Sequence, residues 1–337
     1  MTPAGFALST AVWIVLVAER PEPLANCSSM IVTITLNPSI DRSVAVEALL
    51  PDAKLRCATV VDEPGGGGIN VSRALNRLGS DNLAICTAGG YTGPVLRDLL
   101  DRQEIRYHLL ETSAATRQNL TVFDNATENQ YRFILPYDDA EPMALDGLQS
   151  TLEALDPAPS FIVASGSLPQ GMDSDAYCRI GTMAKNLGAR YVVDTTGKPL
   201  AAALESSVYL VKPNLAELSS LVGKNELEVD AVAEASLQLI RDYPCEIVVV
   251  SVGASGAYFA YQDSVRFVPA PIVKKRSTVG AGDSMVAGIV HSLAANRSIL
   301  EAVQLGVACG TAATMNPGSQ LFDADTAHRL YDWLQRN

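Results

Sequence analysis

Along the chain from Met30, short apolar runs alternate with longer stretches in which apolar residues recur every three or four positions. The runs are rich in valine and isoleucine, and the stretches have the period of an amphipathic helix. Near-continuous apolar strands separated by helices are typical of a parallel sheet covered on both faces. The pattern therefore predicts an α/β fold. Strands are expected at 31–36, 83–87, 161–164, 191–194, 208–211 and 247–251, and helices at 69–78, 94–103, 174–187, 215–222 and 229–241.

Two regions depart from this alternation, at residues 38–62 and 114–136. Both have the composition of strands without an intervening helix, and the second region contains a hairpin signal. Four extended segments from two places predict a small separate sheet, which could act as a lid over the main domain. Its apolar face would need burial, most simply against a second copy, so we expect a homodimer through the lid. The four strands are expected at 43–47, 55–61, 118–124 and 130–135.

Residues 1–29 precede the first predicted strand and do not fit the pattern. The apolar run at 11–18 is too short to span a bilayer, and no lysine or arginine precedes it, so a signal peptide is not indicated. We expect an N-terminal extension that is either a flexible tail or no part of the working protein. The working domain is then expected to occupy residues 30–337.

Composition excludes several classes of protein. With 337 residues, 48% apolar and 18% charged, the chain can bury a substantial core. A net charge of −12 and a pI near 4.7 argue against binding to nucleic acid or to anionic membranes. An anionic substrate must therefore meet a local group of lysine and arginine side chains. The six cysteines are widely separated, which indicates neither a zinc site nor a disulfide framework and favours a reducing, cytoplasmic location.

The stretch from Gly280 to Asp283 is expected to begin a helix, because apolar residues recur at helical spacing after it. Backbone N–H groups at a helix start have no intrahelical partner and favour an anion such as a phosphate. A carboxylate beside such a site suits one task, which is to accept a proton from a hydroxyl that attacks phosphorus. The helix end is expected to lower the pKa of Asp283. The alternative is that Asp283 only stabilises the helix start, but two glycines around an alanine are unusual there.

Four consecutive glycines, Gly65 to Gly68, precede Asn70 and another predicted helix. Bare backbone in this position can approach a polar ligand closely, which favours a binding loop. The alternative is a flexible turn. The Asn70 amide could hydrogen-bond sugar hydroxyls as both donor and acceptor.

Further candidates follow the first strand or fall on the expected lid strands. Asp41 is a second acceptor for sugar hydroxyls, or else an Asx-turn residue. Arg117, Lys54 and Arg56 are expected on lid strands. Guanidinium groups bind phosphate through two parallel hydrogen bonds, so these cations are candidates for a substrate phosphate. They could instead be solvated charges of edge strands.

Lys212, Asn214 and Glu217 follow the fifth predicted strand. The spacing of Asn214 and Glu217 is that of a capping box, which is a sufficient structural explanation alone. In a functional role, the two would order water around Mg²⁺ that is bound to nucleotide phosphates.

The glycine-rich segment Ser251–Gly256 follows the sixth predicted strand. It could line a pocket for adenine and ribose, or be an ordinary turn. His291 lies two turns beyond Asp283 in the predicted helix. We interpret it as a packed core histidine and not as a catalytic partner.

Four motifs together resemble the PfkB (ribokinase-like) family of carbohydrate kinases: 278–283, 65–70, 165–169 and 212–214. The resemblance covers nearly all of residues 30–337. It implies a three-layer α/β/α domain with a mostly parallel central sheet and a small β-sheet lid. The segments at 54–57, 63–70, 116–119, 130–133 and 277–285 are most similar to the family's 6-phosphofructokinases.

This resemblance implies phosphorylation of fructose 6-phosphate at its C1 hydroxyl by Mg·ATP, in glycolysis. Kinases of tagatose 6-phosphate and fructose 1-phosphate are similar but typically carry lysine where this chain has Gly67, which favours fructose 6-phosphate. Those two activities remain alternatives. A non-catalytic sensor of sugar phosphates or nucleotides is the alternative from another class.

The resemblance also implies roles for individual residues, and a homodimer through the lid. Asp283 is the base, and the amides of Gly280, Ala281 and Gly282 form the anion hole. The substrate is held by Asp41, Lys54, Gly66, Asn70 and Arg117. Independently of the resemblance, Arg56, Gly67 and Ser165 are further candidates for substrate binding. The nucleotide is held by Lys212, Asn214, Ser251, Gly253 and Gly256. Glu217 holds Mg²⁺ through water, and K⁺ lies near Ser277, Val279, Ala313, Asn316, Gly318 and Gln320.

Overall fold

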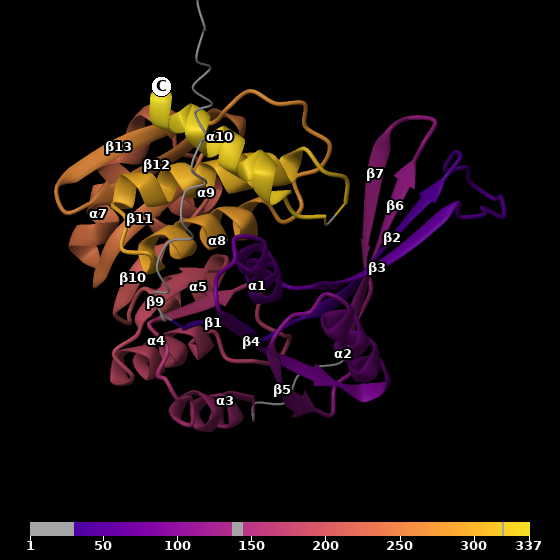
Figure 1. Cartoon of the computed structure of the whole chain (residues 1–337), viewed down its shortest axis with the longest axis horizontal. Helices are drawn as coiled ribbons and strands as arrows, with labels where there is room; N and C mark the ends of the chain where they lie inside the picture. The colour runs from indigo at the N-terminus through magenta and orange to yellow at the C-terminus, as the bar shows by residue number, and fades with distance from the viewer. Residues whose placement is uncertain (1–29, 137–143, 319) are drawn as a thin grey trace, which may run out of the picture.

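A computed structural model describes residues 30–136, 144–318 and 320–337 (Figure 1). The expected extension at 1–29 lies outside the described residues. The larger of two sheets has nine strands, in the order β13-β12-β11-β10-β9-β8-β1-β4-β5. All neighbouring strands are parallel except β12, which is antiparallel to both of its neighbours. The strands are β1 (Ile31–Thr35), β4 (Asn82–Gly89), β5 (Tyr107–Thr112), β8 (Phe161–Ser165), β9 (Arg190–Asp194), β10 (Val208–Val211), β11 (Cys245–Ser251), β12 (Gly256–Tyr261) and β13 (Ser264–Pro269).

Helices cover both faces of this sheet, as the apolar runs predicted. Neighbouring residues on one strand point to opposite faces, so Ile31 and Val32 belong to two different apolar clusters. One face packs against α3 (Ala144–Glu153), α4 (Ala176–Asn186), α5 (Gly197–Ala203), α6 (Leu215–Leu221) and α7 (Val232–Asp242). The other packs against α1 (Gly67–Arg77), α2 (Gly93–Arg102), α8 (Ala281–Ala294), α9 (Ile299–Thr314) and α10 (Ala324–Arg336).

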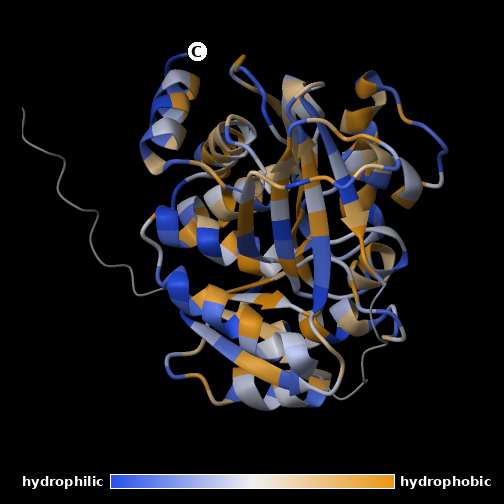
Figure 2. Cartoon of the chain, turned by 90° about the vertical axis from the view of Figure 1, so that its right-hand side faces the viewer, coloured by the Kyte–Doolittle hydropathy of each residue, from blue (hydrophilic) through white to orange (hydrophobic). Residues whose placement is uncertain are grey.

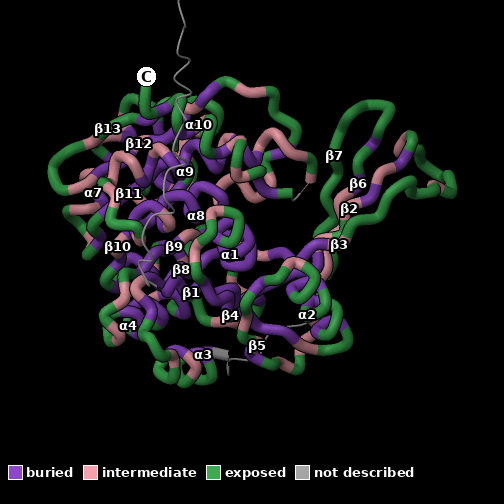
Figure 3. The backbone as a smooth tube through the Cα atoms, viewed as in Figure 1, coloured by how far each residue is buried: buried purple, intermediate pink, exposed green. Residues whose placement is uncertain are grey.

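The second sheet projects from this body as a lid (Figure 1), and the turned view of Figure 2 has this side of the molecule in front. Its order is β3-β2-β6-β7, and its strands come from the two regions predicted to lack helices. Most residues near its free end are exposed, whereas the central strands of the large sheet are buried (Figure 3). The lid strands are β2 (Ser39–Val46), β3 (Thr59–Gly65), β6 (Arg117–Asp124) and β7 (Asn129–Ile134).

Several elements were missing from the sequence prediction. Strand β5 lies at the edge of the sheet and most of its residues are not buried, so it lacks a continuous apolar run. Helix α9 is buried on most sides and therefore shows no amphipathic period. Strands β12 and β13 form a tight antiparallel hairpin that was not predicted. Helices α3, α5 and α10 were also not predicted.

Helices α8 and α9 are in unusually close contact. A Cβ atom on Gly306 would lie 2.8 Å from the Met285 carbonyl oxygen, and one on Gly310 would lie 3.0 Å from that of Ala281. A Cβ on Gly288 would lie 2.8 Å from the Leu305 carbonyl oxygen. The first turn of α8 is thus fixed by backbone packing against α9.

Among the described residues, no helix combines the length and the apolar composition that crossing a bilayer requires.

Candidate active site

Helix α8 begins at the glycine-rich stretch, as predicted. Gly280 is the N-cap residue, with a left-handed φ of 74° that glycine adopts without strain. Within the described chain no side chain caps this helix start. The Ala281 N–H donates to the Thr278 carbonyl at 3.3 Å, so the free N–H groups of the first turn are expected from Gly282 onward. A helix start of this kind leaves donors for an anion.

Asp283 lies in the first turn of α8 and joins three elements. The Asn70 amide nitrogen donates to its Oδ2 at 2.9 Å, and the Ser165 hydroxyl donates to its Oδ1 at 3.4 Å. Burial raises the pKa of Asp283 to about 6, and the charge of Asp194 adds to this shift. The hydrogen bonds and the nearby Lys212 oppose it. The predicted lowering of this pKa was therefore wrong, because loss of water and the charge of Asp194 outweigh the hydrogen bonds and Lys212.

Lys212 is buried, and its Nζ lies 3.2 Å from Asp194 Oδ1. A Cβ on Gly282 would lie 3.4 Å from the same Nζ, so this ion pair is adjacent to the start of α8. Burial acts to lower the pKa of Lys212, but Asp194, Glu217 and Asp283 hold it above its ordinary value. Lys212 was singled out in the sequence, whereas Asp194 was missed. Its position at the end of a predicted strand was the available signal.

The glycine run packs tightly against the rest of the protein. A Cβ on Gly67 would lie 2.2 Å from the Ser165 hydroxyl oxygen, and one on Gly65 would lie 2.3 Å from Asp41 Oδ2. A Cβ on Gly68 would lie 2.4 Å from the Ile34 carbonyl oxygen, and Gly66 has a φ of 112°. The run is thus a tight junction between β3 and α1, which contradicts a merely flexible turn.

Polar side chains gather at the base of the lid. Asp41 lies within strand β2, so the Asx-turn alternative does not hold. The Ser39 hydroxyl and the Asn119 amide both donate to its Oδ1 at 2.8 Å. Arg117 lies at the start of β6 and donates from Nε to the Asn37 carbonyl at 3.3 Å. Ser39 and Asn119 were not predicted.

Lys54 and Arg56 are not on lid strands, contrary to the prediction. Strand β3 begins only at Thr59, and both cations are exposed in the loop between β2 and β3. Asp52 has a φ of 54° in this loop, a left-handed conformation that interrupts an extended strand. The loop lies at the free end of the lid (Figure 1).

A hollow of about 410 Å³ adjoins the start of α8. Ser251, Gly253 and Gly256 line it, together with Ala281 and Gly282. Three of the five nucleotide candidates and two anion-hole candidates thus share one space, which Lys212 and Asn214 do not line. No pattern in the sequence pointed to the other lining side chains, which include Ile272, Val273, Met285, Val307 and Thr311.

Asn214 and Glu217 form the capping box that their spacing predicted. The Glu217 N–H donates to Asn214 Oδ1 at 2.9 Å, and the Asn214 N–H donates to Glu217 Oε2 at 2.8 Å. Burial raises the pKa of Glu217, and the charge of Asp194 contributes. A cation near these two carboxylates would relieve that cost, which fits a Mg²⁺ that is held through water.

Comparison with known proteins identifies the family. The model of the pfkB family of carbohydrate kinases matches residues 29–327. The chain belongs to this family. The ATP-dependent 6-phosphofructokinase isozyme 2 of Escherichia coli K12 is 39% identical over 307 residues, covering 91% of this chain and 99% of that protein. A 1-phosphofructokinase of Xanthomonas campestris is 33% identical over 274 residues, covering 80% of this chain and 86% of its own.

Solved structures of E. coli phosphofructokinase-2 agree with the fold of this pfkB family member. They include a complex with potassium, a complex with fructose-6-phosphate and a tetrameric inhibited form. Their TM-scores are 0.86, 0.84 and 0.83, and their sequence identities are 40%, 38% and 39%. Each comparison covers 91% of this chain and 100% of the other. The ribokinase-like α/β fold with a separate smaller sheet is therefore confirmed.

The segments predicted to hold K⁺ lie together in this family member. The N–H groups of Arg276 and Ser277 donate to the Thr314 carbonyl, and the Ser277 hydroxyl donates to the Gly318 carbonyl at 2.9 Å. Carbonyl and hydroxyl oxygens can replace the hydration shell of K⁺, so this donor set fits the ion. The remaining candidates are in or next to the same two segments: Val279, Ala313, Asn316 and Gln320.

Two other features stand apart from the site. His291 is mostly buried, and its Nδ1 lies 2.7 Å from the Ser80 hydroxyl, as expected of a packed histidine.

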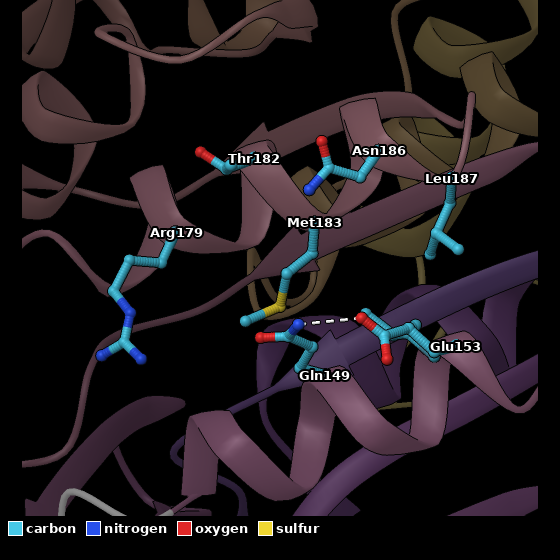
Figure 4. Close-up of a pocket in the computed structure, with 8 residues that line it drawn as sticks. Gln149, Glu153, Arg179, Thr182, Met183, Asn186 and Leu187 are labelled. Carbon is cyan, nitrogen blue, oxygen red and sulfur yellow. Dashed lines mark hydrogen bonds between the residues drawn. The ribbon is translucent and has the colours of Figure 1, made fainter.

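A hollow of about 330 Å³ lies between α3 and α4 (Figure 4). Figure 4 shows Gln149 turned toward Glu153, while the Arg179 guanidinium lies away from this pair. No predicted site residue lines this hollow.

Proposed function

We propose that this chain transfers the γ-phosphoryl group of ATP to the C1 hydroxyl of fructose 6-phosphate, giving fructose 1,6-bisphosphate and ADP. One observation carries the proposal: the hydrogen-bonded Asp283 carboxylate lies at a helix start without a side-chain cap, beside the hollow of the nucleotide candidates. The names of the similar 6-phosphofructokinases support this substrate.

Asp283 acts as the base in this mechanism. The C1 oxygen of the sugar attacks the γ-phosphorus, its proton passes to the Asp283 carboxylate, and the bond from the γ-phosphorus to the leaving oxygen of ADP breaks. A pKa of about 6 makes Asp283 a stronger base than an ordinary aspartate, yet leaves it ionised at neutral pH. Of the predicted anion-hole amides, those of Gly280 and Gly282 stabilise the charge of the migrating group, because the Ala281 N–H already donates to Thr278.

Other residues bind and orient the two substrates. The sugar phosphate lies at the base of the lid, against Asp41, Asn70, Arg117, Ser165 and the loop at Gly66 and Gly67. ATP lies along Lys212, Asn214, Ser251, Gly253 and Gly256. Glu217 would hold Mg²⁺ through water, and the bound ion would neutralise charge on the nucleotide phosphates. Oxygen atoms of Ser277, Val279, Ala313, Asn316, Gly318 and Gln320 would hold K⁺.

The lid supports a homodimer. A row of apolar residues crosses its four strands, with Val60 beside Val44, Val44 beside Val122 and Val122 beside Tyr131. At the two ends of this row Val60 is 59% exposed and Tyr131 is 39% exposed, whereas Val44 and Val122 are buried beside Leu49 and Leu55 of the same chain. Because Lys54 and Arg56 lie at the free end of the lid, they could bind substrate phosphate only across such a dimer.

A charged residue in this apolar row, as in Val60→Lys, tests the lid interface. The variant is expected to shift toward monomer in analytical ultracentrifugation. An unchanged oligomeric state would reject the lid interface.

A coupled assay of ADP release tests the function. ADP should appear with Mg·ATP and fructose 6-phosphate, and tagatose 6-phosphate and fructose 1-phosphate should give lower kcat/KM. Gly67 favours this order, because the similar kinases of those two sugars typically carry lysine at this position. No ADP release with any of the three sugars, together with measurable binding, would instead support a sensor. Preference for fructose 1-phosphate would support a 1-phosphofructokinase, the activity named for the relative from X. campestris.

A further inference from the structure

Arg73 is a buried arginine of α1, one turn after Asn70, and only 4% of it is exposed. Its guanidinium group joins three elements. Nη2 donates to Glu63 Oε1 at 2.6 Å, at the end of lid strand β3. Nε donates to Gln103 Oε1 at 2.6 Å, at the end of α2. Nη1 donates to Asn70 Oδ1 at 3.1 Å and to the Pro64 carbonyl at 3.4 Å.

The contact with Asn70 decides which end of its amide faces the base. An amide has one acceptor end and one donor end. Arg73 has only donors, so it holds the acceptor end, and the donor end reaches Asp283 at 2.9 Å. A reversed amide would set its oxygen against the Asp283 carboxylate and its NH₂ group against the guanidinium. Both contacts would be repulsive.

The same guanidinium connects this amide to the lid. Glu63 is directly opposite Asp41 in the pairing of β3 with β2, and Asp41 is a proposed substrate ligand. A continuous series of hydrogen bonds therefore runs from Glu63 through Arg73 and Asn70 to Asp283. Arginine suits this position because its planar fork satisfies several acceptors in fixed directions, which an ammonium group cannot do.

We propose that Arg73 is a positioning residue: its guanidinium holds the Asn70 amide in the orientation that donates to Asp283, and ties that orientation to the end of lid strand β3 through Glu63. Its importance for phosphoryl transfer rests on the proposed function. The hydrogen-bond relay itself does not, because it can be measured on the Asp283 carboxyl.

The groups around the relay determine whether replacement of Arg73 should raise or lower the pKa of Asp283. Asp283 faces Asp194 at the end of β9 and Lys212 just after β10. Arg73 faces Glu63 of β3, and Arg77 lies one turn further along α1. Arg73 acts on Asp283 through the Asn70 amide, whose hydrogen bond acts to lower the pKa of Asp283. Loosening Arg73 should therefore raise this pKa further.

The test is a titration of Arg73→Lys in the full chain. With ¹³C-labelled aspartate, the Asp283 carboxyl signal is assigned by its absence in Asp283→Asn. Its pKa should rise by roughly half a unit to one unit. In the kinase assay, the acid limb of the kcat profile should move to higher pH than in wild type by the same amount. We expect kcat to fall about tenfold to a hundredfold, with KM for ATP little changed.

Gln103→Ala is the matched control. It removes a hydrogen bond from the same guanidinium on the side away from Asp283, so it should lower thermal stability without moving the Asp283 pKa. If Arg73→Lys does not fold, the double variant Glu63→Gln/Arg73→Gln removes both buried charges together and should show the same pKa rise. An unchanged Asp283 pKa in a folded Arg73 variant would overturn the inference. Inactive wild-type protein would overturn the proposed function alone, since the titration still reports on the relay.

Discussion

Two glycine-rich helix starts carry the candidate chemistry, and they differ in what their missing side chains achieve. At α1, a Cβ on Gly65, Gly67 or Gly68 would lie within 2.2–2.4 Å of another protein atom. At α8, a Cβ on Gly282 would make only ordinary contacts, 3.4 Å from Lys212 Nζ and 4.0 Å from Asp194 Oδ2, although one on the N-cap Gly280 would lie 2.6 Å from Leu321. The first run of glycines is required by packing within the protein. At α8, Gly280 is required by its left-handed φ, whereas Gly282 leaves space beside Asp283. Similar sequence patterns thus serve a structural need at one helix and provide a candidate ligand site at the other.

The largest expected effect is at α8. Asp283→Asn removes the base while keeping the size of the side chain, so kcat should fall about 10³-fold or more. KM for both substrates should change little, because the contacts of the bound ground state remain. Steady-state kinetics with fructose 6-phosphate and Mg·ATP measure both quantities. A matching loss of substrate binding would mean that Asp283 has a structural role, as the glycines do at α1.

A matched pair of alanine substitutions tests the difference between the glycines at the start of α1 and those at the start of α8. Gly67→Ala forces a methyl group against Ser165 and should lower the free energy of unfolding by about 1–3 kcal/mol. Gly282→Ala should leave thermal stability nearly unchanged but lower kcat about tenfold to a hundredfold, because it disturbs the space for the phosphoryl group. Calorimetry and kinetics on both variants separate the effects. Equal destabilisation by both would remove the distinction between the two helix starts.

The raised pKa of Asp283 predicts a change of stability with pH. Its folded pKa is about 6, above its ordinary value of 3.8, so the folded protein holds this proton more tightly than the unfolded chain does. Its contribution to stability therefore falls as the pH rises from about 4 to 6, and above pH 6 the charged carboxylate is a constant cost. Asp283→Asn removes that cost. We expect its Tm to exceed that of wild type by roughly 2–4 °C at pH 8, with a smaller difference at pH 5. An equal difference at both pH values would contradict the raised pKa.

The smallest effect is expected at α6, whose start is capped by side chains, unlike those of α1 and α8. Asn214→Ala removes one half of the capping box and should cost about 1 kcal/mol of unfolding free energy. Chemical denaturation measures this loss. Gln238→Ala, on the exposed surface of α7, serves as the control and should change stability by less than about 0.5 kcal/mol. An Asn214 variant as stable as the control would show that the capping box contributes little.

The sequence predicts the fold best where one pattern has one physical cause. Buried parallel strands require continuous apolar runs, so the central strands were found within a few residues of their bounds. Edge strand β5 and the buried helix α9 were missed, because half-exposed strands and helices buried all round do not show the expected period. The lid was predicted from the absence of helical spacing, although β3 begins four residues later than expected.

For the candidate site, the glycine pattern located Asp283 at a helix start, but the predicted direction of its pKa was wrong. That direction depends on burial and on Asp194, whose distance from Asp283 along the chain hides their proximity in space. Arg73 was missed for a similar reason. In a helical pattern it resembles one more surface charge, and only the folded chain shows its partners on β3 and α2.

The backbone contact between α8 and α9 has a consequence for motion. Where carbonyl oxygens of one helix lie against glycines of the other, neither helix can rotate or slide without a steric clash. The N-terminal turn with Asp283 is therefore a stationary reference, and any opening and closing around a substrate must occur elsewhere. The projecting four-stranded sheet, beyond its tightly packed junction at Gly65–Gly68, is where that movement can occur.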